Sequence, residues 1–163
     1  MAMKGKAHKL GNDINTDYII SGRYKFAITD AKELGKYVFE DLDPQLAGKI
    51  KEGDFVVAGE NFGCGSSREQ APQALKAAGI TAVIAKYFAR IFYRNAINLG
   101  LLLLEADTDT IDDSDELELD MENSKIKILN KNKEIEFKEI PEFMQAILKE
   151  GGVIEYIKKK GDI

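Results

Sequence analysis

The stretch between Asp54 and Leu104 constrains the fold most, because short apolar runs alternate there with helix-like segments that end in glycine. Three runs predicted to be buried strands and two intervening helices, closed by Gly79 and Gly100, occupy residues 54–58, 67–78, 81–85, 88–99 and 101–104. Short connections that contain a helix join parallel strands through a right-handed crossover. Such strands are covered on both faces, which agrees with their continuous apolar sequences. The chain is therefore predicted to contain a parallel α/β sheet.

The rest of the chain shows weaker but complementary patterns. Before the parallel part, we expect a strand at 3–10, an extended segment at 18–20, a helix from Thr29 or Asp30 to Phe39 and a short helix near Asp43-Pro44. After it, we expect alternating strands at 117–119, 125–129 and 134–137 with a turn at 131–133, then a helix at 142–150 that ends at Gly151-Gly152. Residues 153–159 are compatible with helix or strand. These elements predict one α/β domain over residues 1–163 with an additional antiparallel part.

Cysteine and histidine are scarce enough to exclude several self-contained sites. Among 163 residues the chain has 1 cysteine, Cys64, and 1 histidine, His8. A single thiol forms no internal disulfide, cannot alone hold an iron–sulfur cluster, and is typical of a reducing cytoplasm. A metal site with two histidine ligands from this chain is excluded as well.

Charge and hydropathy exclude further classes of partner. The chain has a formal net charge of −5 and lacks the clustered basic residues that are typical of a nucleic-acid-binding protein. No apolar run approaches the roughly 20 residues that cross a bilayer, and residues 1–6 contain no apolar signal core. The lysines at 158–160 are explained by a solvated tail. We therefore expect a cytoplasmic protein without nucleic-acid or membrane partners.

The most informative segment is the glycine-rich loop at residues 61–69, which follows a predicted strand and precedes a predicted helix. Such a loop directs backbone N–H groups and the positive end of a helix toward one point, and Gly63 and Gly65 allow close approach of a ligand. Two serines add hydroxyl groups, and Arg68 adds a forked cation that matches a carboxylate. The loop therefore predicts an anion site.

Three other interpretations of the same loop stay open. Ser66 and Glu69 have the spacing of a capping box, which would account for both residues structurally. The two glycines also match half of a dinucleotide fingerprint, although Arg68 stands where its third glycine would fall. Cys64 fits a small buried apolar residue as well as a reactive thiol.

Three segments together resemble the swivelling domain of the aconitase superfamily. Residues 63–69 (Gly-Cys-Gly-Ser-Ser-Arg-Glu) resemble its Gly-x-Gly-Ser-Ser-Arg-Glu signature, and residues 15–17 (Asn-Thr-Asp) its early Thr-Asp segment. Residues 89–96 resemble its Phe-Ala-Arg-Ile-Phe-x-x-Asn segment. The length is similar to that of stand-alone small subunits of the isopropylmalate isomerase family. The resemblance implies a swivelling β/β/α domain, with a parallel sheet flanked by helices and an antiparallel part.

The same resemblance implies a hydro-lyase whose site is shared between two chains. A large subunit would carry the [4Fe-4S] cluster and the catalytic histidines, in a heterodimer or heterotetramer, while this chain would bind no metal or cofactor. By position, Ser66 matches the family's serine base. Ser67, Arg68 and Gly65 match the part of the loop that holds a substrate carboxylate, and Asp17 matches an acidic residue of the site.

The implied substrate is a small hydroxy dicarboxylate, with isopropylmalate favoured. A loop that follows the Thr-Asp segment in such subunits distinguishes substrates, and here it comprises Arg23, Tyr24, Lys25, Phe26 and Ala27. Phe26 favours an apolar substituent, because burial contributes about 0.8 kcal/mol per CH₂ group. Lys25 would also be compatible with an acidic substituent on the substrate. Packing of the loop alone would also explain the presence of Phe26.

Several alternatives remain at this point. The expected reaction interconverts 2- and 3-isopropylmalate in leucine biosynthesis, and related small subunits serve homoaconitase and 2,3-dimethylmalate dehydratase. Arg23, Arg90 and Arg94 are further candidates for carboxylate contacts, or they form structural ion pairs. A protein of another class, a non-catalytic module that binds a dicarboxylate, would use the same loop.

Overall fold

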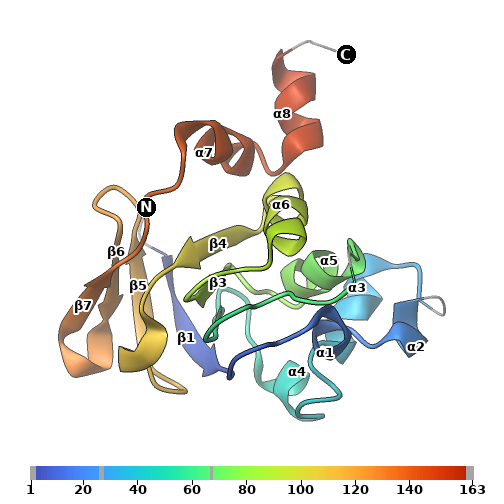
Figure 1. Cartoon of the computed structure of the whole chain (residues 1–163), viewed down its shortest axis with the longest axis horizontal. Helices are drawn as coiled ribbons and strands as arrows, with labels where there is room; N and C mark the ends of the chain where they lie inside the picture. The colour runs from blue at the N-terminus through green and yellow to red at the C-terminus, as the bar shows by residue number, and fades with distance from the viewer. Residues whose placement is uncertain (1–2, 26–27, 67, 161–163) are drawn as a thin grey trace.

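The computed structural model describes residues 3–25, 28–66 and 68–160, and within them a mixed sheet forms the centre of the molecule (Figure 1). Its 7 strands have the order β4-β3-β2-β1-β5-β6-β7. The strands are β1 (Met3–Lys9), β2 (Phe55–Val57), β3 (Ala82–Ala85), β4 (Leu102–Glu105), β5 (Glu116–Asp120), β6 (Lys125–Ile128) and β7 (Lys133–Glu136). Neighbours from β1 to β4 are parallel, and those from β1 through β5 to β7 are antiparallel.

Strand β1 joins the parallel and antiparallel parts. Its first half, residues 3–6, pairs antiparallel with β5, and its second half, residues 7–9, pairs parallel with β2. The backbone of Gly53 comes so close to Gly5 that a methyl group there would lie 2.2 Å from the Gly53 carbonyl oxygen. Only glycine fits at this crossing of two backbones.

Helices and 3₁₀ turns connect the strands. The α-helices are α1 (Thr16–Ile19), α2 (Gly22–Lys25), α3 (Ala31–Leu34), α4 (Leu46–Lys49), α5 (Gln70–Ala77), α6 (Arg90–Asn98), α7 (Glu142–Lys149) and α8 (Val153–Lys160). The 3₁₀ turns are η1 (Gly35–Tyr37), η2 (Thr108–Thr110) and η3 (Leu129–Lys131). In Figure 1 the helices up to α5 lie on the side of the molecule opposite β5–β7, and α7 and α8 lie at the top. None of the helices in the described ranges combines the length and apolar character needed to cross a membrane.

Two hydrophobic clusters cover opposite faces of the parallel strands. Val56 belongs to the cluster packed under the helices, whereas its neighbours Phe55 and Val57 belong to the other cluster. That second cluster also holds Leu117 and Ile126 of the antiparallel strands. Alternation with a period of two thus places helices over one face and antiparallel strands over the other. The α/β fold with an antiparallel part is confirmed.

Most predicted elements are confirmed, but the helix predicted to reach Phe39 is α-helical only to Leu34 and ends with η1, because Val38 is extended and Phe39 has φ +60°. The two glycines end their helices as predicted. Gly79 has φ +100°, and after α5 the Ile80 amide donates to the Leu75 carbonyl at 3.2 Å, a Schellman pattern. Gly100 has φ +82° and ends α6 in the same way. The ambiguous residues 153–159 are helical in α8.

The prediction of an extended segment at 18–20 is wrong for most of its length. Residues 16–19 form α1, because the Asn15 side chain caps that turn by accepting from the Tyr18 amide at 3.0 Å. The aromatic and β-branched residues that suggested a strand are instead held by this cap, and Ile19 is buried.

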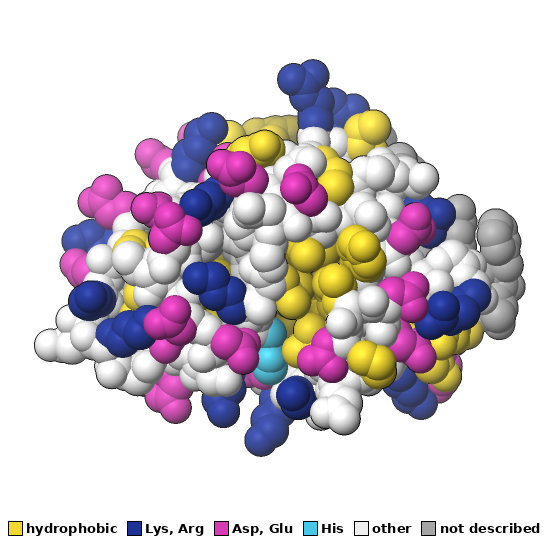
Figure 2. Space-filling model, turned by 60° about the horizontal axis from the view of Figure 1, so that its bottom comes forward, with side chains coloured by type: hydrophobic (Ala, Val, Ile, Leu, Met, Phe, Trp, Pro, Cys, Tyr) yellow, Lys and Arg dark blue, Asp and Glu magenta, His cyan; other side chains and the backbone are white. Residues whose placement is uncertain are grey.

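Two buried carboxylates stabilise the frame. His8 Nε2 lies 2.7 Å from Asp54 Oδ2, and both residues are nearly buried. Figure 2 shows the exposed edge of His8 beside a patch of hydrophobic side chains. Burial alone would raise the pKa of Asp54, but hydrogen bonds from His8 and from the Lys51 and Lys6 amides hold it below its ordinary value.

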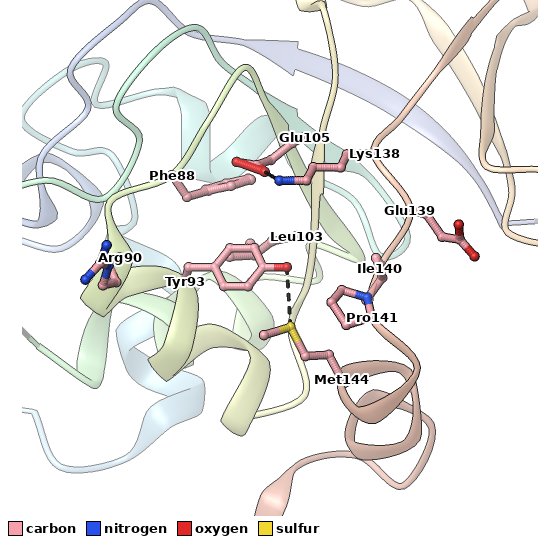
Figure 3. Close-up of a pocket in the computed structure, with 10 residues that line it drawn as sticks. All are labelled: Phe88, Arg90, Tyr93, Leu103, Glu105, Lys138, Glu139, Ile140, Pro141 and Met144. Atoms are coloured by element: carbon pink, nitrogen blue, oxygen red, sulfur yellow. Dashed lines mark hydrogen bonds and ion pairs between the residues drawn. The ribbon is translucent and has the colours of Figure 1, made fainter.

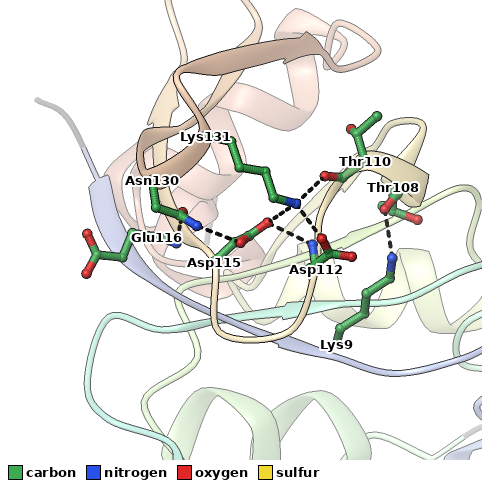
Figure 4. A network of polar contacts seen from close by, with 8 residues as sticks. All are labelled: Lys9, Thr108, Thr110, Asp112, Asp115, Glu116, Asn130 and Lys131. Atoms are coloured by element: carbon green, nitrogen blue, oxygen red, sulfur yellow. Dashed lines mark hydrogen bonds and ion pairs between the residues drawn. The ribbon is translucent and has the colours of Figure 1, made fainter.

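The second buried carboxylate, Asp115, ties the start of β5 to η3 (Figure 4). It accepts from the Asn130 side chain at 2.8 Å and lies 2.8 Å from Lys131 Nζ. The same ammonium group contacts Asp112 Oδ2 at 2.6 Å and the Thr110 carbonyl at 3.0 Å. Burial tends to raise the pKa of Asp115, but these donors lower it overall.

Candidate active site

The three recognised segments, far apart in sequence, lie side by side. The Gly63 amide donates to the Ile14 carbonyl at 2.7 Å, and an isolated parallel bridge joins Asn15 to Cys64. A second bridge on the other side of the loop joins Phe62 to Phe88. The glycine-rich loop therefore runs between the start of α1 and the start of α6, as a short extension of sheet-like pairing.

Arg68 and Asp17 form the charged centre of this arrangement. Arg68 Nη1 lies 2.5 Å from Asp17 Oδ1, and the Arg68 side chain is 16% exposed while that of Asp17 is 59% exposed. Nε and Nη1 of Arg68 are shielded from solvent and make no hydrogen bond of good geometry to the described residues, despite the short distance of Nη1 to Asp17. Of these two atoms, only Nε is therefore without a polar partner among the described residues, and the guanidinium held by Asp17 has the charge and the forked shape that match a carboxylate.

Ser66 and Gly65 lie beside this centre at the surface. Thr16 Oγ1 donates to the Ser66 backbone carbonyl at 2.9 Å, and the exposed Ser66 hydroxyl makes no hydrogen bond to any described residue. Gly65 has φ +94°, a conformation that non-glycine residues rarely adopt. Ser67 lies outside the described residues, so its predicted role in binding a carboxylate stays a prediction.

The helix after the loop begins later than predicted. Its first residue is Gln70, with Glu69 as N-cap and no side-chain capping hydrogen bond. The capping box of Ser66 and Glu69 is therefore wrong, and Ser66 lies outside the first turn of α5. The ion pair of Arg68 with Asp17 and the contact of Thr16 with the Ser66 carbonyl hold Ser66 and Arg68, neither of which is helical, against α1.

A hollow of about 220 Å³ brings several predicted residues together. The predicted residues Gly65, Ser66 and Arg68 line it. The other lining residues come from α1, the loop and α6: Thr16, Gly63, Ala89, Arg90, Ile91 and Phe92. Arg94, one turn after Arg90, lines neither this hollow nor the larger one beside it.

The larger hollow, of about 490 Å³, lies between α6, β4 and the segment before α7 (Figure 3). Its wall includes Tyr93, whose hydroxyl lies 3.6 Å from Met144 Sδ, and a loose ion pair of Lys138 with Glu105 at 3.7 Å. Arg90 lines both hollows, and in Figure 3 its guanidinium points away from Tyr93. No other described residue predicted for the site lines the larger hollow.

The predicted specificity loop is only partly described. Arg23 and Tyr24 lie in α2 and turn toward the segment after η1, where Arg23 contacts Asp41 at 2.9 Å. For Arg23, the structural ion pair considered from the sequence is thus present. Phe26, Ala27 and the side chain of Lys25 lie outside the described residues.

Cys64 and His8 do not form a metal site. Cys64 is half-buried in the loop, and burial followed by the charge of Asp13 raises its pKa. The His8 ring is occupied by Asp54. Across the described ranges, no group of three or more His, Cys, Asp or Glu side chains is arranged to hold a metal ion.

Comparison with known proteins identifies the family. Residues 25–109 match the model of the aconitase C-terminal domain. A 3-isopropylmalate dehydratase small subunit of Archaeoglobus fulgidus is 57% identical, covering 100% of this chain and 99% of that protein. The chain belongs to the 3-isopropylmalate dehydratase small-subunit family. A family member from Caldicellulosiruptor saccharolyticus is 55% identical over 97% of this chain and 92% of its own length. The crystal structure of 3-isopropylmalate dehydratase from Methanocaldococcus jannaschii superimposes with a TM-score of 0.96 at 52% identity, covering 99% and 96% of the two chains.

Membership of the 3-isopropylmalate dehydratase small-subunit family confirms the relationship predicted from the three motifs. Sequence reasoning missed Thr16 and Ile91 as lining residues of the hollow, although both lie within recognised segments. Arg90 was one of three arginines considered for carboxylate contacts, and nothing in the sequence favoured it over Arg94. The signal that separates these two arginines is helix position, since Arg90 begins α6 next to the loop and Arg94 lies one turn farther on.

Proposed function

We propose that this chain is the small subunit of a two-chain 3-isopropylmalate dehydratase, a hydro-lyase that interconverts 2- and 3-isopropylmalate in leucine biosynthesis. The names and full-length similarity of its relatives support this activity. The observation that carries the assignment of residues is the shared hollow, in which the loop of Gly65 and Ser66 meets Arg68 and Arg90. A cytoplasmic location agrees with such a biosynthetic role.

Arg68 is proposed to bind the carboxylate next to the carbon that loses a proton. Dehydration of a hydroxy acid places a second negative charge on this carboxylate as the proton leaves. A fixed guanidinium stabilises charge that develops in the transition state, and it needs no solvent reorganisation. Asp17 holds Nη1 of this guanidinium, so the ion pair orients the side chain before substrate arrives.

Ser66 is proposed as the base that removes the proton and returns it during rehydration. A serine hydroxyl is far too weak a base at neutral pH, so positive surroundings must favour its ionisation. Arg68 and Arg90 line the same hollow and bring two positive charges to it. Since α5 begins at Gln70, this role falls to the arginines more than to the helix end predicted from the sequence.

The remainder of the active site is proposed to come from a large subunit, in a heterodimer or heterotetramer. When bound there, a [4Fe-4S] cluster supplies a Lewis acid for the departing hydroxyl group. The single cysteine of this chain cannot hold such a cluster. The substrate is proposed to be a hydroxy dicarboxylate with an apolar substituent near Phe26.

The test is anaerobic co-expression with a large subunit of the same family and assay of isopropylmalate, homoaconitate and dimethylmalate. The wild-type complex should favour isopropylmalate. Ser66→Ala should lower kcat by about 10²- to 10⁴-fold, the usual contribution of a general base. Ser114→Ala, which changes an exposed serine in another loop, should keep full activity.

A second pair of variants tests the carboxylate contact. Arg68→Lys keeps the charge but loses the forked geometry, so it should lower kcat/KM strongly, whereas Arg94→Lys should not. Full turnover by this chain alone would contradict a shared site. Unchanged ligand binding and unchanged function in Ser66→Ala would instead favour a non-catalytic dicarboxylate-binding module.

A further inference from the structure

Two side-chain contacts fasten α2 to the end of η1 and to the segment that follows it. Arg23 Nη2 donates to Asp41 Oδ1 at 2.9 Å, and the Tyr24 ring stacks on Tyr37 with centroids 4.2 Å apart and planes 14° from parallel. The Arg23 guanidinium carbon lies 5.0 Å from the Tyr24 ring centroid, so the two contacts support each other. We call Arg23, Tyr24, Tyr37 and Asp41 the α2 clasp.

Tyr37 and Asp41 of the α2 clasp flank a turn that is anchored in the hydrophobic core. Between its two residues, Val38 and Phe39 are both 0% exposed. Phe39 has φ +60°, and its amide donates to the Ile19 carbonyl at 3.0 Å. An aromatic residue is held at positive φ only where the surroundings determine its conformation. Tyr37 and Asp41 are therefore presented from a fixed turn.

Helix α2, which carries Arg23 and Tyr24 of the α2 clasp, also approaches the candidate active site. Gly22 begins α2, and a methyl group on it would lie 3.6 Å from Arg68 Nη1 and 3.9 Å from Nη2. The backbone of α2 is thus in contact range of the guanidinium that Asp17 holds through Nη1. The position of α2 therefore limits the space that the Arg68 guanidinium can occupy.

We propose that Tyr37 and Asp41 are positioning residues that set substrate affinity and selectivity by holding α2 against Arg68. The inference rests on the proposed function, because it assumes that Arg68 binds the substrate carboxylate. Neither these residues nor any residue of α2 lines the hollow, so Tyr37 and Asp41 act on it through the close approach of Gly22 to the Arg68 guanidinium. Their loss lets α2 occupy more positions, and the fraction of molecules ready to bind falls.

The test uses the anaerobic complex and two variants of the α2 clasp. Asp41→Asn should raise KM for isopropylmalate about 2- to 5-fold, since the ion pair is largely exposed. Tyr37→Leu should raise KM about 2- to 10-fold, the range expected for loss of a stacked pair. Changes in kcat should be smaller than in KM, and selectivity for isopropylmalate over its methyl analogue should fall.

Matched variants separate positioning from general damage. Glu33→Gln removes a similar exposed carboxylate that pairs with Lys36 at 2.9 Å and not with Arg23, so KM should stay at the wild-type value. Tyr37→Phe and Asp41→Glu preserve the stack and the charge and should restore most of the affinity. Thermal melting checks that each variant is folded.

A readout on the free chain does not depend on turnover. Trypsin should cleave after Arg23 faster in Asp41→Asn and Tyr37→Leu than in Glu33→Gln, because α2 is released. Wild-type KM and wild-type cleavage rates in both variants would overturn the positioning role and leave the proposed function standing. A wild-type complex that turns over none of the hydroxy dicarboxylates would overturn the proposed function itself.

Discussion

Replacing Gly63 by alanine should destabilise the chain strongly, for two separable reasons. Gly63 has φ +85°, where a Cβ atom costs about 1–2 kcal/mol. The new methyl group would also lie 2.2 Å from Cγ of the buried Phe92, and relieving such overpacking costs about 1–3 kcal/mol. The expected loss in free energy of unfolding is therefore about 2–5 kcal/mol.

Two other glycines allow each contribution to be measured by urea unfolding. Gly151 has φ +93° but nothing within 4 Å of a methyl group, so Gly151→Ala should lose only the conformational part, about 1–2 kcal/mol. Gly11 has open space and no positive φ, and Gly11→Ala should change stability little. If Gly63→Ala lost no more than Gly151→Ala, the contact of the loop with Phe92 would not be the constraint described here.

Three further predictions follow from the buried and titrating groups. Hydrogen-bond donors hold the pKa of Asp54 below its unfolded value of about 4, so the Asp54 carboxylate stabilises the fold above that pH and loses this effect on acidification. The difference in unfolding free energy between wild type and Asp54→Asn, measured by urea titration, should therefore shrink as the pH falls from about 5 to 3. A difference that grows on acidification would contradict this sign. Asp115→Ala removes the buried carboxylate that accepts from Asn130, and it should lower the unfolding free energy by about 1–3 kcal/mol in chemical denaturation. Asp109→Ala, whose side chain is 70% exposed, should have little effect, and equal losses would argue against the Asp115 network. Iodoacetamide should alkylate Cys64 with a pH midpoint above that of a free thiol, and Asp13→Asn should lower this midpoint. A midpoint equal to that of a free thiol in both proteins would show that burial and the Asp13 charge do not act on the Cys64 thiol.

The parallel part of the fold was predictable because its signals are local. Apolar runs and terminal glycines identify strands and helix ends from a few neighbouring residues, and Gly79 and Gly100 do so here. The start of α5 was not predictable, because Ser66 and Glu69 look like a capping box in the sequence. Contacts with Thr16 and Asp17, some 50 residues away in the chain, override that local preference.

In the candidate site too, local features were predictable from the sequence and long-range contacts were not. Its motif residues were recognisable one segment at a time, but the bridges from Asn15 to Cys64 and from Phe62 to Phe88 that bring the segments together are long-range. Tyr37 and Asp41 gave no sequence signal at all, since they lie outside every recognised motif. Their relation to α2 depends on the positive φ of Phe39, which no propensity rule anticipates.

The central place of β1 has a consequence for the newly made chain. This strand is synthesised before its partners, which are residues 55–57 and 116–119. Until β5 has been translated, the edge of residues 3–6 has no neighbour and is open to pairing with other chains. Nascent or truncated chains that stop before residue 116 should therefore be the aggregation-prone forms, because only the later addition of β5 covers the exposed edge of β1.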